Sequence, residues 1–113
     1  MESKKIRVLL ADDHKILRKG VRMLIDSQPD MEVIGEAKTG REAIEQARQL
    51  KPDIVVMDVS MPELNGIEGT RQICDEMKNT RVVALSMHKD SVYVREILRA
   101  GARGYLLKDS EDD

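Results

Sequence analysis

The sequence predicts an α/β fold built around a parallel sheet. Short runs of aliphatic and β-branched residues alternate with stretches in which apolar residues recur at helical spacing. The runs are almost continuously apolar, which is typical of parallel strands that helices cover on both faces. With 113 residues, the chain is long enough for one ordinary core. We therefore expect a single α/β domain of five strands with right-handed crossovers.

The first two strands are expected at Ile6–Ala11 and Met31–Ala37. Apolar residues recur at helical spacing between them, and the helix should end before Pro29, because the residue before a proline disfavours the helical conformation. The apolar positions of this helix are Leu17, Val21, Leu24 and Ile25.

A capping box opens the second expected helix. Thr39-Gly40-Arg41-Glu42 places a threonine three residues before a glutamate, and these two side chains can satisfy free amides at a helix start. Pro52 stops the helix, and Ile54–Met57 is the third expected strand. The buried stripe of the helix is expected to contain Ala43, Ile44, Ala47 and Leu50.

The second half of the chain continues the alternation. A loop at Val59 to Asn65 precedes the third helix, and the fourth strand is expected at Arg81–Met87. Asp90 should cap a fourth helix that ends near Gly101, and Gly104–Leu107 is a short fifth strand. The inward positions of these two helices are Ile67, Ile73 and Met77, then Val94, Ile97 and Leu98.

After Lys108 the alternation breaks, because only five polar residues remain. A sheet of this class needs cover on both faces. We therefore expect residues 1–113 to be one domain that lacks its final helix, and the natural chain to continue past Asp113.

Composition excludes several classes of protein. Nineteen Lys and Arg against 21 Asp and Glu give a formal net charge of −2, and the chain has two Tyr but no Phe or Trp. The basic excess and the stacking residues typical of nucleic-acid binding are therefore missing. One cysteine cannot form an internal disulfide, and the apolar run near the N-terminus is too short for a signal peptide or membrane span. We expect a cytoplasmic protein without a membrane segment.

Three acids follow or end apolar runs: Asp12 and Asp13 come directly after the first, and Asp58 comes directly after the third. In an open parallel sheet, chemistry gathers at the carboxyl ends of the strands, where the strand order reverses. Three carboxylates would repel there unless a hard divalent cation joined them. Asp58 is then a candidate nucleophile for phosphoryl transfer. The alternatives are an ordinary turn residue at Asp58 and helix caps at Asp12 and Asp13.

Two further polar residues fall at strand ends. Ser86 and Lys108 lie at the ends of the fourth and fifth strands, where a hydroxyl and an ammonium can bind phosphoryl oxygens. Each alone is more simply a solvated terminus residue, but together with the three acids they predict a magnesium-dependent phosphoryl site. For His14 a solvated or capping role is favoured.

These residues resemble the receiver domains of two-component response regulators. The resemblance covers Ile6 to Ser110 and rests on the acid pair, on Asp58 followed by Met-Pro and Asn-Gly, on Ser86 and on Gly-Tyr-Leu-Leu-Lys. Residues 85–88, 101–105 and 108–110 resemble the NarL/FixJ-type branch, whose members usually carry a LuxR-type helix-turn-helix output domain. The implied fold is a flavodoxin-like, doubly wound sheet with strand order 2-1-3-4-5.

The resemblance implies a role for each site residue. Asp58 would accept a phosphoryl group from a sensor histidine kinase. Mg²⁺, with Mn²⁺ as a substitute, would bind Asp13 and Asp58 directly, Asp12 through water, and the backbone carbonyl of Ser60. The residues implied to bind the phosphate or to move with it are Lys108, Ser86 and Tyr105.

The implied protein is a phosphorylation-dependent switch and not an enzyme beyond its own phosphotransfer and dephosphorylation. Its output would be transcription regulation through a DNA-binding domain missing from this chain. Phosphorylation would also favour formation of a homodimer. One alternative is a stand-alone receiver that acts by protein contact. Another is a magnesium phosphatase of the haloacid-dehalogenase type, although Ser60 stands where that class has a second aspartate.

Overall fold

The computed structural model describes residues 5–58, 66–86 and 91–107. Within them, five strands alternate with four helices and form one parallel sheet of order β2-β1-β3-β4-β5, which confirms the expected topology. The strands are β1 Ile6–Ala11, β2 Met31–Ala37, β3 Ile54–Asp58, β4 Arg81–Ser86 and β5 Gly104–Leu107. The helices are α1 Lys15–Asp26, α2 Gly40–Leu50, α3 Gly66–Glu76 and α4 Ser91–Arg99.

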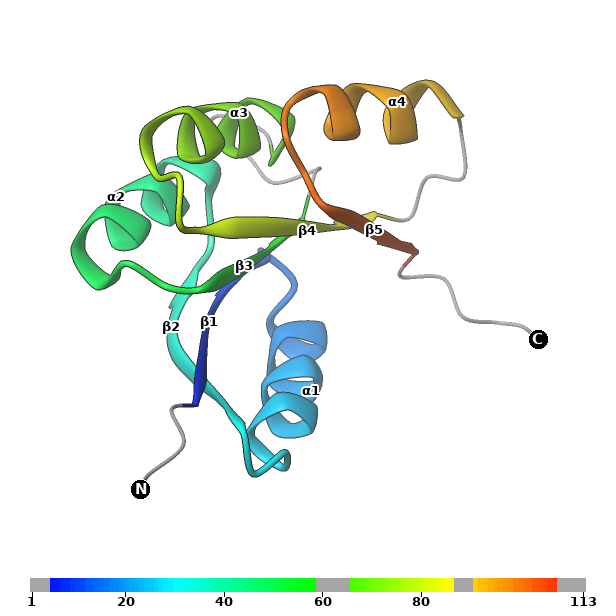
Figure 1. Cartoon of the computed structure of the whole chain (residues 1–113). Coiled ribbons are helices and arrows are strands. Elements are labelled where there is room, and N and C mark those ends of the chain that lie inside the picture. The colour runs from blue at the N-terminus through cyan, green and yellow to red at the C-terminus, as the bar shows by residue number, and fades with distance from the viewer. Residues whose placement is uncertain (1–4, 59–65, 87–90, 108–113) are drawn as a thin grey trace.

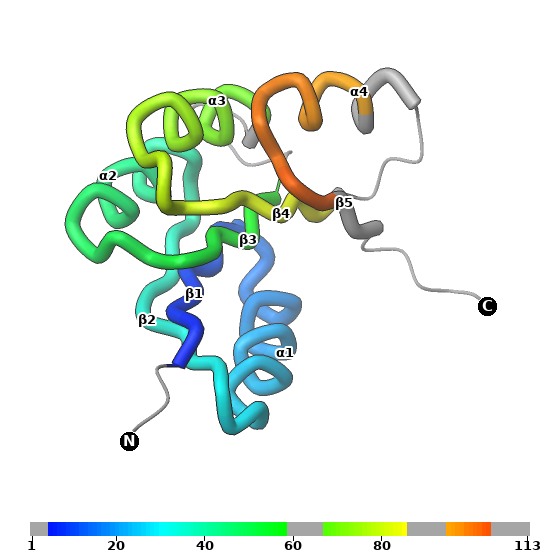
Figure 2. The backbone as a smooth tube through the Cα atoms, viewed as in Figure 1, coloured from blue at the N-terminus to red at the C-terminus, as the bar shows by residue number. Residues whose placement is uncertain are grey.

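The helices are divided unequally between the two faces of the sheet. Helix α1 lies on one face, whereas α2, α3 and α4 lie on the other (Figure 1), and the tube in Figure 2 shows the same separation. The main core lies on the three-helix side, where small and aliphatic residues of α2 and α3 pack on β1, β3 and β4. Its buried residues are Leu9, Ala11, Ala37, Ala43, Ile44, Ala47, Val55, Met57, Ile73 and Val82.

The start of α2 follows the predicted capping box with one difference. The Thr39 hydroxyl accepts a hydrogen bond from the Glu42 amide at 3.0 Å, as expected. The Glu42 carboxylate, however, accepts from the amide of Lys38 at 2.9 Å and not from that of Thr39. Both hydrogen bonds fix the chain where it leaves β2, so the sequence signal predicted the helix start correctly.

Two leucines contradict the expected helix faces. Leu24 in α1 and Leu98 in α4 are 69% and 46% exposed. Helical spacing predicts a buried apolar stripe, but helix α1 contacts chiefly β1 and β2, and none of its residues is fully buried. In α4, Ile97 is fully buried as predicted, whereas Asp90 lies outside the described residues and the side chain of Val94 is not described.

Small boundary differences accompany the strands. The third strand includes Asp58, because its backbone still pairs with Leu85 of β4. The fourth strand ends at Ser86, and Met87 lies outside the described residues. Gly101 has a φ of +120°, as expected for a glycine that ends a helix, and a Cβ there would lie 2.8 Å from the Cys74 side chain.

In the part of the chain that the structure describes, no helix combines the length and apolarity needed to cross a membrane.

Candidate functional site

The three predicted acids meet at the carboxyl edge of the sheet. Strands β1 and β3 are parallel neighbours, so the turn after β1 lies beside the last residue of β3. This arrangement brings Asp12, Asp13 and Asp58 together with His14, with one potential ligand atom from each residue lying within 4.8 Å of the others. We call these four residues the acidic cluster. The predicted convergence of the acids is confirmed by this geometry.

The acids differ in their access to solvent. The side chain of Asp58 is fully buried, that of Asp12 is 5% exposed and that of Asp13 is 33% exposed. Adjacent carboxylates supply the hard oxygen donors that Mg²⁺ prefers, and the opening at Asp13 leaves room for the waters that this ion usually keeps. The donor set therefore fits a hard divalent cation.

The backbone fixes Asp12 more firmly than a free turn would. Its amide donates to the Ala37 carbonyl of β2 at 3.0 Å, and its Oδ1 accepts from the His14 amide at 2.8 Å. Its carbonyl accepts from the Arg18 guanidinium at 2.6 Å. Asp12 therefore fixes the turn between β1 and α1. Neither Asp12 nor Asp13 is the N-cap of α1, because that residue is His14, so the alternative in which the two acids serve as helix caps is wrong.

The contacts of His14 with the acids were not predicted from the sequence. As expected for a solvated or capping residue, its side chain is 57% exposed and it stands at the N-cap of α1, but the side chain makes no capping hydrogen bond to α1. Instead Nδ1 lies 3.0 Å from Asp12 Oδ1, 3.3 Å from Asp13 Oδ1 and 3.6 Å from Asp58 Oδ2. Its position directly after the acid pair was the available signal, because an aspartate side chain that binds the amide two residues later folds the chain back on itself.

The remaining predicted site residues are placed only in part. Ser60 and Lys108 lie outside the described residues. Ser86 ends β4 next to Leu85, the residue paired with Asp58, and the backbone of Ser86 pairs with Leu107 of β5. The backbones of Ser86 and Tyr105 are described in β4 and β5, whereas their side chains are not. Their roles therefore stay predictions.

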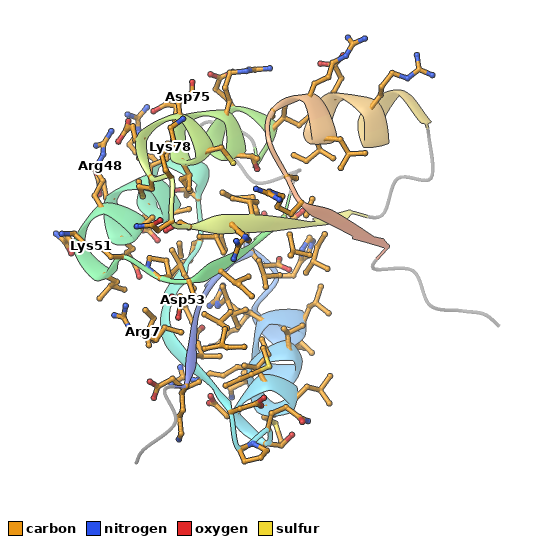
Figure 3. All side chains as sticks on the ribbon, in the orientation of Figure 1. Arg7, Arg48, Lys51, Asp53, Asp75 and Lys78 are labelled. Carbon is orange, nitrogen blue, oxygen red and sulfur yellow. The ribbon has the colours of Figure 1, made fainter. Side chains whose placement is uncertain are left out.

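A separate charged region lies at the opposite edge of the sheet. A cavity of about 410 Å³ opens there beside the ends of α2 and α3. Four charged residues of its lining, Arg48, Lys51, Asp53 and Lys78, are labelled in Figure 3. Arg48 donates two 2.8 Å hydrogen bonds to Glu76, and these bonds lower the pKa of Glu76 and raise that of Arg48. Because this cavity adjoins the amino ends of β3 and β4, it is distinct from the acidic cluster. The labelled residues in Figure 3 are Arg7, Arg48, Lys51, Asp53, Asp75 and Lys78.

Comparison with known proteins agrees with this fold and identifies the family. The family model described as the response regulator receiver domain matches residues 8–113. The chain therefore belongs to the response regulator receiver domain family, which is a family of regulatory domains.

Individual relatives support the LuxR-type branch. The chain is 48% identical over 110 residues to the uncharacterized transcriptional regulatory protein YxjL of Bacillus subtilis, covering 97% of this chain and 50% of that protein. It is 44% identical over 106 residues to the transcriptional regulatory protein LiaR of the same species, covering 94% and 50%. A LuxR-family two-component response regulator from Aurantimonas sp. SI85-9A1 superposes with a TM-score of 0.89 at 39% identity, covering 96% of this chain and 77% of that one. The chain spans about half the length of the curated relatives it matches.

Proposed function

We propose that this chain is a phosphorylation-dependent switch in which Asp58 accepts a phosphoryl group from a sensor histidine kinase. The observation that carries the proposal is the meeting of a fully buried Asp58 with Asp12 and Asp13 at the carboxyl edge of the sheet, in a chain of the receiver family. A carboxylate held at this edge is the nucleophile that an aspartyl phosphate requires.

The transfer itself is a displacement at phosphorus. A carboxylate oxygen of Asp58 forms a bond to phosphorus while the phosphorus–nitrogen bond of a phosphohistidine breaks, and the imidazole leaves with the electron pair. Attack by water on the aspartyl phosphate later returns the carboxylate and releases inorganic phosphate. A bound Mg²⁺ would neutralise charge on the phosphoryl oxygens during both steps. Asp13 and Asp58 would hold the ion directly, Asp12 through water, and Ser60 through its backbone carbonyl.

The output follows from the added charge. A phosphoryl group on Asp58 adds acceptor oxygens and negative charge at the end of β3. Lys108 and Ser86 would bind these oxygens, and Tyr105 would turn inward as Ser86 moves. A two-state surface near α4 and β5 would thus be biased toward its active form, which would also favour a homodimer.

We further propose that the switch controls transcription through a DNA-binding segment of the whole protein. The relatives named as transcriptional regulatory proteins are about twice as long as the matched region. The acidic net charge of this chain makes direct binding of DNA by the receiver unfavourable. A stand-alone receiver that acts by protein contact is the alternative, and the test is to read the residues encoded after Asp113.

Phosphorylation is tested with acetyl phosphate and Mg²⁺. Intact-protein mass spectrometry should detect one added phosphoryl group on the wild type, and phosphopeptide mapping should place it on Asp58. The Asp58→Asn variant should gain none. Asp75→Asn, which changes an exposed aspartate outside the acidic cluster, should label like the wild type. Equal labelling of Asp58→Asn and wild type would overturn the assignment.

A further inference from the structure

The turn that carries the acid pair is tied to β2 by a buried arginine. Arg18 lies one turn into α1, and its side chain is only 10% exposed. Its Nη1 donates to the Asp12 carbonyl at 2.6 Å, and its Nε donates to the Glu36 carboxylate of β2 at 2.7 Å. One guanidinium therefore bridges a strand carboxylate and the backbone of the acidic cluster.

The carbonyl that Arg18 binds belongs to the peptide unit joining Asp12 to Asp13. The plane of that peptide determines where the Asp13 side chain begins, because the two residues share it. Other hydrogen bonds of the turn hold the amide and the Oδ1 of Asp12, and the His14 ring lies 3.3 Å from Asp13 Oδ1. Arg18 differs from these contacts because its side chain binds the carbonyl of the link between the two acids.

Glu36 is held firmly enough to serve as the anchor. Burial alone would raise its pKa, but hydrogen bonds from Arg18 and Arg22 outweigh this effect and lower the pKa, so the carboxylate stays ionised. Its backbone carbonyl also accepts a 2.6 Å hydrogen bond from the Gln46 side chain of α2. The bridge therefore starts from a residue fixed by two helices.

We infer that Arg18 is a positioning residue: by fixing the Asp12–Asp13 peptide against Glu36, it sets the affinity of the acidic cluster for divalent cations. The inference rests on the proposed function, because it takes the acids as the cation ligands. A lysine cannot replace the arginine, since one ammonium lacks the planar fork that reaches both acceptors.

A positioning role and a purely electrostatic role of Arg18 predict opposite changes in cation affinity when Arg18 is replaced. Removing a positive charge near the acids should tighten cation binding if charge alone matters, whereas loss of the bridge should weaken it. Arg18→Gln removes charge and bridge, and Arg18→Lys keeps the charge but loses the fork. Arg22→Gln is the matched control, because Arg22 contacts the same Glu36 carboxylate from the next turn of α1. This variant removes a neighbouring charge, whereas Arg18 keeps its hydrogen bonds to Glu36 and to the Asp12 carbonyl.

The experiment measures Mn²⁺ dissociation constants by electron paramagnetic resonance of the free ion, with Mg²⁺ in competition. Each variant is measured at a temperature where far-ultraviolet circular dichroism shows it fully folded, so a loss of stability alone leaves the constant unchanged. We expect Arg18→Gln and Arg18→Lys each to bind about tenfold more weakly, the equivalent of one lost hydrogen bond, and Arg22→Gln to stay within about twofold of the wild type. If Arg18→Gln does not fold, the Mn²⁺ dissociation constant of Arg18→Lys alone tests the inference.

Wild-type affinity in Arg18→Lys, tighter binding in Arg18→Gln, or equal weakening in Arg22→Gln overturns the inference. Asp13→Asn separates this failure from failure of the proposed cation site. If Asp13→Asn binds Mn²⁺ as well as the wild type does, the site assignment itself is wrong. If Asp13→Asn loses binding while both Arg18 variants keep it, only the positioning role fails.

Discussion

Replacing Asp13 by asparagine should stabilise the metal-free protein. The acidic cluster places the Asp13 carboxylate within 4.8 Å of the nearest ligand atoms of Asp12 and Asp58. Two unit charges at that distance repel by about 3.5 kcal/mol at an effective dielectric constant of ~20, and by about 0.9 kcal/mol in water. Asparagine keeps the shape of the side chain and removes the charge, so part of this repulsion is relieved.

The expected gain lies near the lower of these values. Asp13 is one-third exposed, so water screens its charge, and the His14 ring nitrogen 3.3 Å away offsets part of the repulsion. We expect Asp13→Asn to raise the free energy of unfolding by about 1 kcal/mol, which corresponds to about 4 °C in Tm for a domain of this size. Added Mg²⁺ should then raise the Tm of the wild type more than that of the variant, because a ligand that binds only the folded state stabilises it.

The assay is thermal unfolding followed by circular dichroism, in chelator and in a series of Mg²⁺ concentrations. Asp75→Asn is the control: it removes one charge from an exposed position on α3, and we expect it to shift stability by less than about 0.5 kcal/mol. A Tm of Asp13→Asn at or below that of the wild type in chelator would refute the account of the site as three repelling carboxylates. An equal Mg²⁺ response of variant and wild type would refute Asp13 as a cation ligand.

Two further predictions concern the parts of the fold that support the site. Thr39→Ala should lower the free energy of unfolding by about 1 kcal/mol in urea titrations, because the Glu42 amide loses its capping partner, and Thr39→Ser should restore most of it; equal midpoints for Ala and wild type would contradict the cap. Glu36 has a lowered pKa in the folded state, so its ionised form contributes stability above the unfolded pKa that is lost as the pH falls through the folded one. Stability should therefore decline less steeply below about pH 4.5 in Glu36→Gln than in the wild type, and parallel curves would contradict this linkage.

The fold was predictable because each local signal agreed with the others. The apolar runs, the helical spacing and the Thr39 capping box all indicated the same alternation, and the structure follows it. The exposure of Leu24 and Leu98 was not predictable in this way. Periodicity shows which side of a helix is apolar, but it does not show how much of that side another element covers. The exposure of the two leucines depends on how far α1 and α4 reach over the sheet, which is a tertiary property.

The acids of the site were predictable for a topological reason, whereas their supports were not. Parallel neighbouring strands must bring Asp12 and Asp58 to one edge, whatever the details of packing. The Arg18–Glu36 bridge instead joins residues 18 positions apart, across a β1–β2 ladder whose register shifts between Val8 and Leu9. No spacing rule places a guanidinium across such an irregularity, so its partner could be found only in the structure.

The anchors of the β1–α1 turn also explain why the two adjacent acids differ. Hydrogen bonds hold the amide and the carbonyl of Asp12, whose side chain is nearly buried, whereas Asp13 is the most exposed acid of the cluster. A cation with its waters can therefore approach from the Asp13 side without disturbing the turn, while Asp58 stays buried at the end of β3. Under the proposed function, a change at Asp13 acts first on the cation, one at Arg18 on the shape of the turn and one at Asp58 on the phosphoryl group. Because these effects have different readouts, the three sets of variants can be interpreted separately.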